Sequence, residues 1–583
     1  MARSWEEIYE QWNRFENLDS KLKNELEDIK TDQVMLEDAF YRELTFGTGG
    51  IRGLLGPGTN RMNIYIVRKA VHGLANYLMK HRVNVKQRGV VIAYDSRYMS
   101  KEFAVEAARV LGAKGISSYV FESLRPTPLL SFAVRYFGAA AGIMITASHN
   151  PPEYNGLKVY NETGGQIIPE EAEQIIAAIT DIEDALSIPV RDQTELEKEQ
   201  LFYWVEDEVD AAYLDRLSVI SRMDETMYKK EKDLNIVYTP LHGTGTSLVK
   251  QGLNQMNFPN VTIVEEQAIP DPEFTTVESP NPEEHQAFKL AIEYGEKANA
   301  DILLATDPDA DRLGAAVKNA VGEYVVLTGN QLGSLLLDYI LAHRDPNVFR
   351  NARMIKTVVT TELGRAIADS YHVETIETLT GFKYIAEKIA TFDATGETFI
   401  FGFEESYGYL INGFTRDKDA VQAAVLSAEM AYYWKIQGKT VLEALENLYE
   451  KHGFYLEDMT SMKFEGKKGT KQIAAIMDGV RNKTLKQIAD FKVVEIENYA
   501  VSERLLVETG RIEPITLAKE NMLKFILEED AWVCLRPSGT EPKIKYYYGV
   551  RGNSSSDSEK KIKKLKAAME EIISEIINNR EYV

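Results

Sequence analysis

Three aspartates alternate directly after a short apolar run in the stretch ADILLATDPDADR. In an extended segment, Asp307, Asp309 and Asp311 point to the same side. Three like charges held close together repel one another, and a hard divalent cation with oxygen ligands compensates them. Arg312 stands where an EF-hand calcium loop requires glycine, and Lys318 where it requires glutamate, so that class of site is excluded. The pattern predicts an Mg²⁺ site with positions open for a phosphate, the alternative being an ordinary acidic turn.

A second polar cluster follows the apolar run AAAGIMI, residues 139–145. The next stretch, TASHNPPEYNGLKVY, presents Ser148, His149 and Asn150 where the predicted strand ends. Ser, Asn and Pro are ordinary turn formers, so a plain turn is one interpretation. The other makes Ser148 a nucleophile, kept exposed by a rigid turn that brings Lys158 back toward it. The residues that would make this turn rigid are Pro151, Pro152, Asn155 and Gly156.

Three further loops carry groups suited to a phosphorylated sugar. In FGTGGIRG, residues 46–53, backbone N–H groups could approach an anion while Arg52 adds a guanidinium, although a glycine turn is the alternative. GFEESYG places Glu404, Glu405 and Ser406 after an apolar strand, which suits sugar hydroxyls or the cap of a following helix. RPSGTEPK places hydrogen-bond donors for a phosphate around Gly539, namely Arg536, Ser538, Thr540 and Lys543. The alternative is a turn that caps a helix.

Alternating strands and helices would position these loops. The opening 45 residues have helical spacing, and from Gly89 short apolar runs alternate with amphipathic stretches. This βαβ pattern predicts parallel sheets, and its recurrence predicts three tandem α/β units with a loop at the carboxyl end of a strand in each. After Phe454 a mixed segment, a hairpin pattern in VCLRPSGTEPKIKYYYGV and a Lys/Glu-rich helix predict a closing α+β module.

Composition narrows the class of protein. The chain has 583 residues, 44% hydrophobic and 27% charged, as in soluble globular proteins of several domains. We expect neither a membrane span nor a signal peptide, because no apolar window is long enough and the N-terminus lacks an apolar core. The single Cys534 fits a reducing cytoplasm. A net charge of −22 argues against nucleic acid as a partner, but a local basic pocket could still bind a small phosphorylated molecule.

The motifs T-A-S-H-N-P, D-x-D-x-D-R, G-x-E-E-S and R-x-S-G-T-E-P, in this order, resemble the α-D-phosphohexomutase superfamily. The resemblance runs from about Gly47 to Gly549, and GTGGIRG and TLTGFK are most similar to the phosphoglucomutase and phosphopentomutase branch. It implies three tandem related α/β domains with mixed sheets and a C-terminal TBP-like α+β domain around a central cleft. We expect an N-terminal helical segment with domain I, then domains II, III and IV, at residues 1–215, 216–325, 326–452 and 453–583.

The resemblance also implies roles for individual residues. Ser148 would be phosphorylated in the resting enzyme, and its phosphate would bind Mg²⁺ together with the three aspartates. His149 would belong to the catalytic group, Arg52 would contact the phosphoserine region, and Lys158 would transfer protons. The residues implied to bind the sugar and its distal phosphate are Arg312, Thr380, Glu404, Ser406, Lys418, Arg536, Ser538, Gly539 and Thr540.

The activity implied by the resemblance is a phosphosugar isomerisation. It would interconvert glucose 1-phosphate and glucose 6-phosphate, with glucose 1,6-bisphosphate as primer and intermediate. Phe382 follows Thr-Gly where mannose-accepting relatives have His, which favours a gluco- or pento-configured substrate. A phosphopentomutase therefore stays open, acting between ribose or deoxyribose 1-phosphate and 5-phosphate. More remote alternatives are a sugar-phosphate phosphatase and a non-catalytic sugar-phosphate-binding protein. The sequence does not indicate an oligomeric state.

Overall fold

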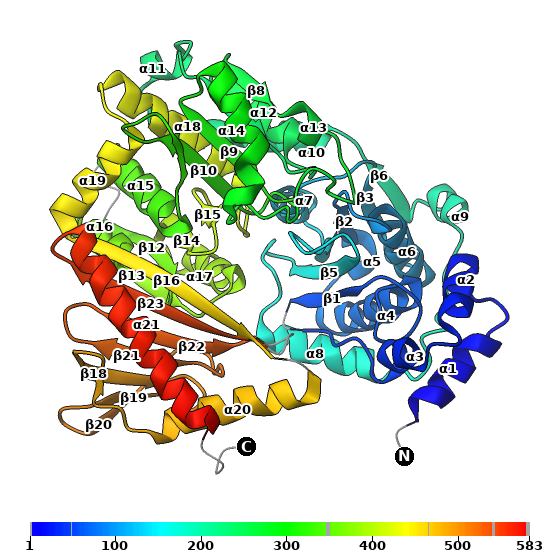
Figure 1. Cartoon of the computed structure of the whole chain (residues 1–583). Coiled ribbons are helices and arrows are strands. Elements are labelled where there is room, and N and C mark those ends of the chain that lie inside the picture. Colours follow the sequence, from blue (N-terminus) through cyan, green and yellow to red (C-terminus); the bar gives the residue numbers. More distant parts are fainter. Residues whose placement is uncertain (1–2, 48, 345–349, 465, 539–542, 579–583) are drawn as a thin grey trace. The chain divides into compact units, whose positions relative to one another are not determined.

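The chain divides into two compact units in a computed structural model (Figure 1). The first unit contains residues 1–329 and 382–440, and the second contains residues 330–381 and 441–583. The structure describes residues 3–47, 49–344, 350–464, 466–538 and 543–578. None of the helices in these ranges is both long and apolar enough to cross a membrane.

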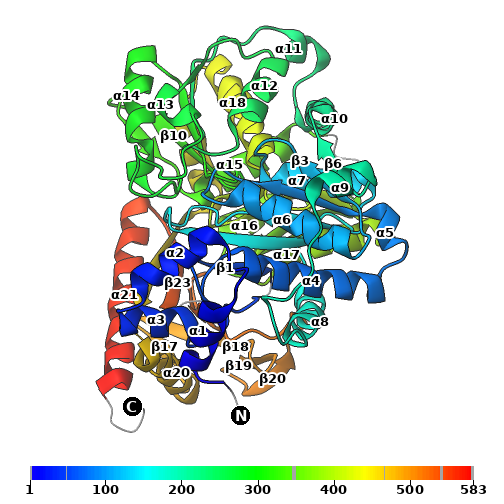
Figure 2. The ribbon, with the colours of Figure 1, turned by 90° about the vertical axis from the view of Figure 1, so that its right-hand side faces the viewer.

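Three short helices begin the first unit, as the apolar spacing predicted. They are α1 (Trp5–Arg14), α2 (Ser20–Ile29) and α3 (Gln33–Phe40). Trp12 makes edge-to-face contacts with Phe40 and with Tyr65, at centroid distances of 5.7 and 5.4 Å. Tyr65 belongs to α4 (Ile64–His81), so this buried aromatic cluster attaches the N-terminal helices to the first α/β domain. Figures 1 and 2 show these three helices next to that domain.

The first sheet has six strands in the order β1-β5-β4-β2-β3-β6. Strands β2, β3, β4 and β6 are parallel, but β5 runs antiparallel to both β4 and β1. The mixed sheet of the predicted fold class is therefore confirmed, whereas the βαβ pattern alone predicted only parallel strands. The short connection from β4 to β5 leaves no room for a crossover helix, so β5 returns antiparallel. The strands are β1 (Gly50–Leu54), β2 (Val90–Tyr94), β3 (Ser118–Phe121), β4 (Ala141–Ile145), β5 (Tyr154–Asn161) and β6 (Phe202–Val205).

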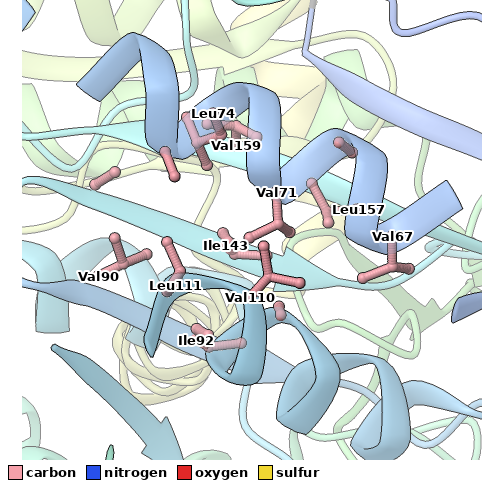
Figure 3. Close-up of a cluster of buried hydrophobic side chains, with 14 of the residues drawn as sticks. Val67, Val71, Leu74, Val90, Ile92, Val110, Leu111, Ile143, Leu157 and Val159 are labelled. Carbon is pink, nitrogen blue, oxygen red and sulfur yellow. The ribbon is translucent and has the colours of Figure 1, made fainter. Parts of the chain in front are cut away.

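Helices cover this sheet with branched apolar side chains. Val67, Val71 and Leu74 of α4 point toward Ile143 of β4 and Val159 of β5 (Figure 3). These side chains are buried in one continuous core, and their burial is the main favourable contribution to folding. The other helices of this domain are α5 (Val85–Arg88), α6 (Ser100–Ala113), α7 (Thr127–Phe137), α8 (Pro169–Thr180), α9 (Gln193–Lys198) and α10 (Glu208–Leu217).

The second sheet has five strands in the order β11-β10-β9-β7-β8. Strand β7 is parallel to β8 and β9, whereas β10 is antiparallel to β9 and β11. The strands are β7 (Ile236–Thr239), β8 (Val261–Ile263), β9 (Ile302–Thr306), β10 (Leu313–Lys318) and β11 (Tyr324–Val326). The neighbouring helices are α11 (Glu225–Lys229), α12 (Thr246–Gln255), α13 (Glu265–Ala268) and α14 (Lys289–Ala298).

The remaining segment of the first unit supplies a hairpin and two long helices. Strand β14 (Thr398–Glu404) pairs antiparallel with β15 (Gly408–Leu410). Helix α17 (Phe382–Thr395) precedes this hairpin and α18 (Ala420–Ile436) follows it. The hairpin thus places the predicted sugar loop in the same unit as the aspartate loop.

The second unit combines a small parallel pair of strands with a large antiparallel sheet. Strands β12 (Ala352–Thr357) and β13 (Glu374–Thr378) are parallel and connected through α16 (Glu362–Ser370). The antiparallel sheet has the order β16-β23-β22-β21-β18-β19-β20, with β17 paired to β18. Its strands are β16 (Phe454–Lys463), β17 (Gln487–Ile488), β18 (Phe491–Asn498), β19 (Glu503–Leu506), β20 (Arg511–Pro514), β21 (Leu523–Leu527), β22 (Trp532–Pro537) and β23 (Lys543–Gly552).

Helices complete the second unit. They are α15 (Gly329–Ala342), of which only the first residue belongs to the first unit, α19 (Val441–His452), α20 (Gly466–Asn482) and α21 (Ser555–Asn578). Helix α21 packs against β23, β16 and α20, and Ile562, Leu565 and Met569 form its buried stripe. An antiparallel sheet with helices packed against it is the predicted α+β module.

Candidate active site

The three aspartates converge after strand β9. One carboxylate oxygen from each of Asp307, Asp309 and Asp311 lies within 4.8 Å of the others, and all three residues are buried. The segment is a tight turn with Ala310 in the left-handed region at φ 48°, so the expected extended conformation was wrong. The turn forms because Asp307 Oδ1 accepts the backbone N–H groups of Asp311 (3.1 Å) and Arg312 (3.0 Å).

Two buried carboxylate oxygens in this cluster lack a donor. Asp309 Oδ1 and Asp311 Oδ1 have no hydrogen-bond partner among the described residues. A buried charged oxygen without a partner costs several kcal/mol or more, so such atoms are rarely left unsatisfied. A hard cation satisfies both oxygens at once, and the all-oxygen donor set fits Mg²⁺.

Two lysines balance part of the negative charge. Lys158 Nζ lies 2.7 Å from Asp309 Oδ2 and 3.2 Å from Asp311 Oδ2, and Lys418 Nζ lies 3.0 Å from that second oxygen. Burial alone would lower the pKa of Lys158, but the carboxylates of Asp309 and Asp311 raise it above its usual value. Both lysines are therefore cations that neutralise the cluster, and neither is a free base in this arrangement.

Ser148 lies beside the aspartate cluster. Its Oγ donates to Asp307 Oδ2 at 2.7 Å and lies 3.3 Å from His149 Nδ1. We expected an exposed serine, yet Ser148 is only 4% exposed, because the carboxylate from the second α/β domain covers its hydroxyl. Burial lowers the pKa of His149 well below its usual value, so the imidazole is neutral near pH 7. A hydroxyl between a carboxylate and a neutral imidazole is placed for group transfer.

Strands β1 and β5 set the remaining groups of this first site. Arg52 pairs with Gly156 across the two strands, and its Nη1 donates to Asn150 Oδ1 at 2.8 Å. The predicted anion loop around Arg52 is thus largely strand, since residues 50–54 form the edge of the sheet. Asn155 and Gly156 likewise belong to β5 rather than to a turn. Lys158 lies two residues further along this strand, and its Nζ contacts Asp309 and Asp311; its approach to Ser148 stays a prediction.

The predicted sugar loop joins the same unit. Glu404 ends β14 and is 4% exposed, while Ser406 lies in the turn before β15. The backbone of Gly408 bridges to that of Arg312, and the Arg312 guanidinium pairs with Glu283. The Glu404 carboxylate also raises the pKa values of Arg312 and Lys418, although Glu283 and Asp311 respectively contribute more to these increases.

The other predicted binding residues belong to the second unit. Thr380 follows β13, and its buried Oγ1 has no hydrogen-bond partner among the described residues. Arg536 Nε donates to Glu520 Oε1 at 2.5 Å, and the Ser538 N–H donates to the carbonyl of Lys543 at 2.7 Å. Gly539 and Thr540 lie outside the described residues. Roles for all these residues stay predictions.

Sequence reasoning missed several side chains that touch the site. Thr127 donates through Oγ1 to Asp309 Oδ2 at 2.8 Å, and Tyr160 donates to Asp417 Oδ2 at 2.7 Å. Asp417 in turn lies 3.4 Å from Lys418 Nζ. The stretch TRDKDA, residues 415–420, contains both Lys418 and Asp417 and was available as a signal for Asp417. Nothing around Thr127 distinguishes it from a residue that begins a helix.

Comparison with known proteins agrees with this architecture. Four stretches match phosphoglucomutase/phosphomannomutase domains: alpha/beta/alpha domains I, II and III over residues 43–186, 211–322 and 328–452, and the C-terminal domain over residues 480–572.

Proteins named phosphoglucomutase are similar over most of the chain. The one from Staphylococcus haemolyticus is 39% identical, covering 88% of this chain and 91% of its own length. One from Staphylococcus aureus is 40% identical, covering 90% and 93%. The chain belongs to the phosphoglucomutase/phosphomannomutase family.

Solved structures of this phosphoglucomutase/phosphomannomutase family have the same fold. A putative phosphomannomutase from Thermus thermophilus superposes with a TM-score of 0.67 at 21% identity, covering 91% of this chain and 99% of its own. The open form of parafusin from Paramecium gives a TM-score of 0.65 at 17% identity, covering 92% and 95%. The predicted superfamily and fold class are confirmed, whereas the domain boundaries given above stay predictions. The N-terminal helices α1–α3 precede the first family domain.

Proposed function

We propose that the chain interconverts glucose 1-phosphate and glucose 6-phosphate by phosphoryl transfer through Ser148. The observation that carries this proposal is the 2.7 Å hydrogen bond from Ser148 Oγ to Asp307, within a cluster whose two neighbouring aspartates each have a buried oxygen with no hydrogen-bond donor among the described residues. The names of the phosphoglucomutase relatives support the same reaction. The buried Cys534 and its lack of a disulfide fit an enzyme of the reducing cytoplasm.

The aspartate cluster would hold one Mg²⁺. Asp307, Asp309 and Asp311 would each supply one oxygen, and a phosphate oxygen on Ser148 would supply another. When bound, Mg²⁺ neutralises negative charge on the oxygens around phosphorus as the phosphoryl group moves. The cations of Lys158 and Lys418 border the same carboxylates and would face the sugar phosphate that enters beside them.

The reaction would proceed in two balanced transfers. A hydroxyl oxygen of the sugar monophosphate attacks the phosphorus on Ser148, the bond from phosphorus to Ser148 Oγ breaks, and the proton of the sugar hydroxyl passes to Ser148 Oγ. The product of this half is glucose 1,6-bisphosphate. After the bisphosphate turns round, Ser148 Oγ attacks its other phosphorus, the bond from that phosphorus to the sugar oxygen breaks, and the proton of the Ser148 hydroxyl passes to the sugar oxygen. The neutral His149 lies beside Ser148 Oγ, and Arg52 donates to Asn150 in the same loop; both would steady the phosphoryl group during the two transfers.

Binding of the sugar would use the remaining predicted residues. Glu404 and Ser406 would accept and donate hydrogen bonds to sugar hydroxyls, and Arg312 and Thr380 would line the sugar site. The phosphate that is not reacting would bind the loop that contains Arg536 and Ser538, together with Gly539 and Thr540. Arginine and backbone or hydroxyl donors are the groups that proteins use to bind phosphate.

Replacement of Ser148 tests the proposal directly. We expect Ser148→Ala to fold normally and to lose roughly 10³-fold or more of turnover, because the phosphoryl carrier is gone. Ser187→Ala, at an exposed serine of the same domain, is the matched control and should keep full activity. Full turnover in Ser148→Ala would overturn the assignment.

Substrate preference is tested by comparing two sugar phosphates on one preparation of the protein. Rates with glucose 1-phosphate and ribose 1-phosphate should favour the hexose phosphate, and addition of glucose 1,6-bisphosphate should abolish any initial lag. Preference for ribose 1-phosphate would make the chain a phosphopentomutase instead. Steady release of inorganic phosphate would indicate a phosphatase, and binding without isomerisation would indicate a binding protein.

A further inference from the structure

Arg97 lies beneath the loop that carries Ser148. Its side chain is fully buried, and its guanidinium donates to backbone carbonyls along the whole connection from β4 to β5. Nη1 and Nη2 each serve two of these carbonyls. The accepting residues are Ser148 (2.6 Å), Asn150, Pro151 (2.8 Å) and Tyr154 (3.0 Å).

Asp95 holds the guanidinium in place. Its Oδ2 lies 3.4 Å from Arg97 Nε, and its Oδ1 accepts the Arg97 backbone N–H (3.0 Å) and the Ser100 hydroxyl (2.8 Å). The Asp95 N–H donates to the carbonyl of Ile145 at 3.1 Å, at the end of the strand that precedes the loop. The charge of Arg97 is therefore paired, and its direction is fixed from the side of the sheet.

The aromatic ring of Phe274, from the second α/β domain, covers the other side of the Arg97 guanidinium. The Phe274 ring centroid lies 5.0 Å from the Arg97 guanidinium carbon, and Phe274 is 1% exposed. Flat stacking on an aromatic ring is a contact that arginine makes better than lysine. Arg97 thus lies between the domain of Ser148 and the domain of the aspartates.

The loop requires such support because its backbone conformation is unfavourable. Ser148 has φ 51°, in the left-handed region that a serine seldom adopts. Such a backbone conformation is energetically costly and persists only where surrounding contacts over-determine it. Four hydrogen bonds from one buried cation to the loop carbonyls are contacts of this kind.

We propose that Arg97 is a positioning residue that fixes the Ser148 loop in the conformation from which the phosphoryl group is transferred. The inference rests on the proposed mutase function, and nothing in the phosphoryl transfer requires Arg97 to touch the substrate. Its effect is therefore expected on kcat more than on KM, because a displacement of about 1 Å at a reacting group lowers the rate roughly 10²-fold.

The test compares two arginines of the same domain. Arg97→Lys keeps the charge but offers a compact ammonium that cannot reach four carbonyls. The matched control is Arg88→Lys, because Arg88 donates to the carbonyls of Gly138 (2.9 Å) and Ala139 (3.0 Å), just before the start of β4. The readouts are kcat and KM for glucose 1-phosphate, and amide hydrogen exchange of residues 147–153 without substrate.

We expect Arg97→Lys to lower kcat about 10²-fold with KM changed less than about threefold, and to speed amide exchange in the Ser148 loop. Arg88→Lys should change neither. Equal behaviour of the two variants, or unchanged exchange in the loop, would overturn the proposal. If the unsubstituted protein shows no mutase activity, the proposed function fails, and the exchange data alone decide whether Arg97 orders the loop.

A second variant covers the case in which Arg97→Lys does not fold. Phe274→Leu keeps the guanidinium and removes only the ring that stacks on it. Because leucine cannot make the cation–π contact that holds the guanidinium, we expect kcat to fall about tenfold and exchange in the loop to rise. Wild-type kcat and exchange in Phe274→Leu would contradict the proposed role.

Discussion

Asp309 has an unusual set of neighbours for a single carboxylate. One oxygen accepts from both Lys158 and Thr127, while the other has no hydrogen-bond partner among the described residues. Burial alone would raise the pKa of Asp309, but the ammonium of Lys158 and the surrounding donors lower it below its usual value. The carboxylate is therefore held ionised, with a free oxygen for a cation.

Neutralising Asp309 should weaken cation binding. We expect Asp309→Asn to raise the Mg²⁺ concentration needed for half-maximal activity roughly 10- to 100-fold, because an amide is a poorer ligand than a carboxylate. Titration of activity with Mg²⁺ measures the change, and Mn²⁺ binding followed by paramagnetic resonance gives a readout without turnover. Asp233→Asn, at an exposed aspartate of the second domain, is the control. Identical titrations for the two variants would refute the metal site.

Removal of the cation should stop the reaction without unfolding the chain. We expect EDTA to abolish turnover and Mg²⁺ to restore it. Ligand binding to the folded state alone stabilises it by about 2.7 kcal/mol at 100 times the dissociation constant, so thermal unfolding should shift upward as Mg²⁺ is added. An unfolding temperature that does not respond to Mg²⁺ would contradict binding at the aspartates.

At the scale of elements, the aspartate turn is supported by a second loop. Residues 240–245 follow β7, and Thr244 donates through N (2.8 Å) and Oγ1 (2.9 Å) to the carbonyl of Pro308. Gly243 lies so close that an added Cβ would stand 2.4 Å from Pro308 Cα and 2.5 Å from its carbonyl oxygen. Because the added Cβ would meet backbone atoms and no flexible side chain, the aspartate turn itself would have to shift.

Gly243→Ala should therefore disturb the metal site from a distance. We expect weaker Mg²⁺ activation and a loss of stability of about 1–3 kcal/mol, in the range of overpacked cores. Gly438→Ala is the control: its φ of 71° makes alanine strained, but nothing lies within 4 Å of the added Cβ. The control should lose about 1 kcal/mol of stability and no Mg²⁺ affinity. Normal Mg²⁺ activation in Gly243→Ala would show that the turn tolerates the displacement.

The sequence predicted some of this arrangement and not the rest, for physical reasons. Three aspartates within five residues converge because the local chain geometry alone brings them together, so the motif sufficed. The contact of Ser148 with Asp307 joins two domains and has no local signal. Arg97 was missed because Asp-Ser-Arg after a strand is also an ordinary turn. The reversal of β5 depended on a pairing with β1 that periodicity does not encode.

At the scale of the whole molecule, distant segments of the second unit meet at a buried acid. Glu457 of β16 accepts from Thr361 Oγ1 at 2.5 Å and from Asn330 Nδ2 at 3.1 Å. Burial raises its pKa from 4.5 to about 7. The folded state thus binds this proton more tightly than the unfolded chain, and the free energy of unfolding falls as pH rises from about 4.5 to about 7.

Glu457→Gln should remove this dependence. Compared with the unsubstituted chain, we expect a free energy of unfolding higher by about 1–2 kcal/mol at pH 8 and similar near pH 4.5, since the glutamine stays neutral throughout. Chemical denaturation at the two pH values measures the difference. Glu450→Gln, at an exposed glutamate of α19, should show no such difference. A gain of equal size at both pH values would rule out a titrating Glu457.

The two lysines on the aspartate cluster bear on whether the chain folds before or after it binds a metal ion. Lys158 and Lys418 come from segments 260 residues apart, yet both reach Asp311 Oδ2. Because these cations supply internal counter-charges, the acidic turn can close before any metal ion arrives. A newly made chain can then close this turn without a bound ion, and binding of a metal ion becomes a separate, later step.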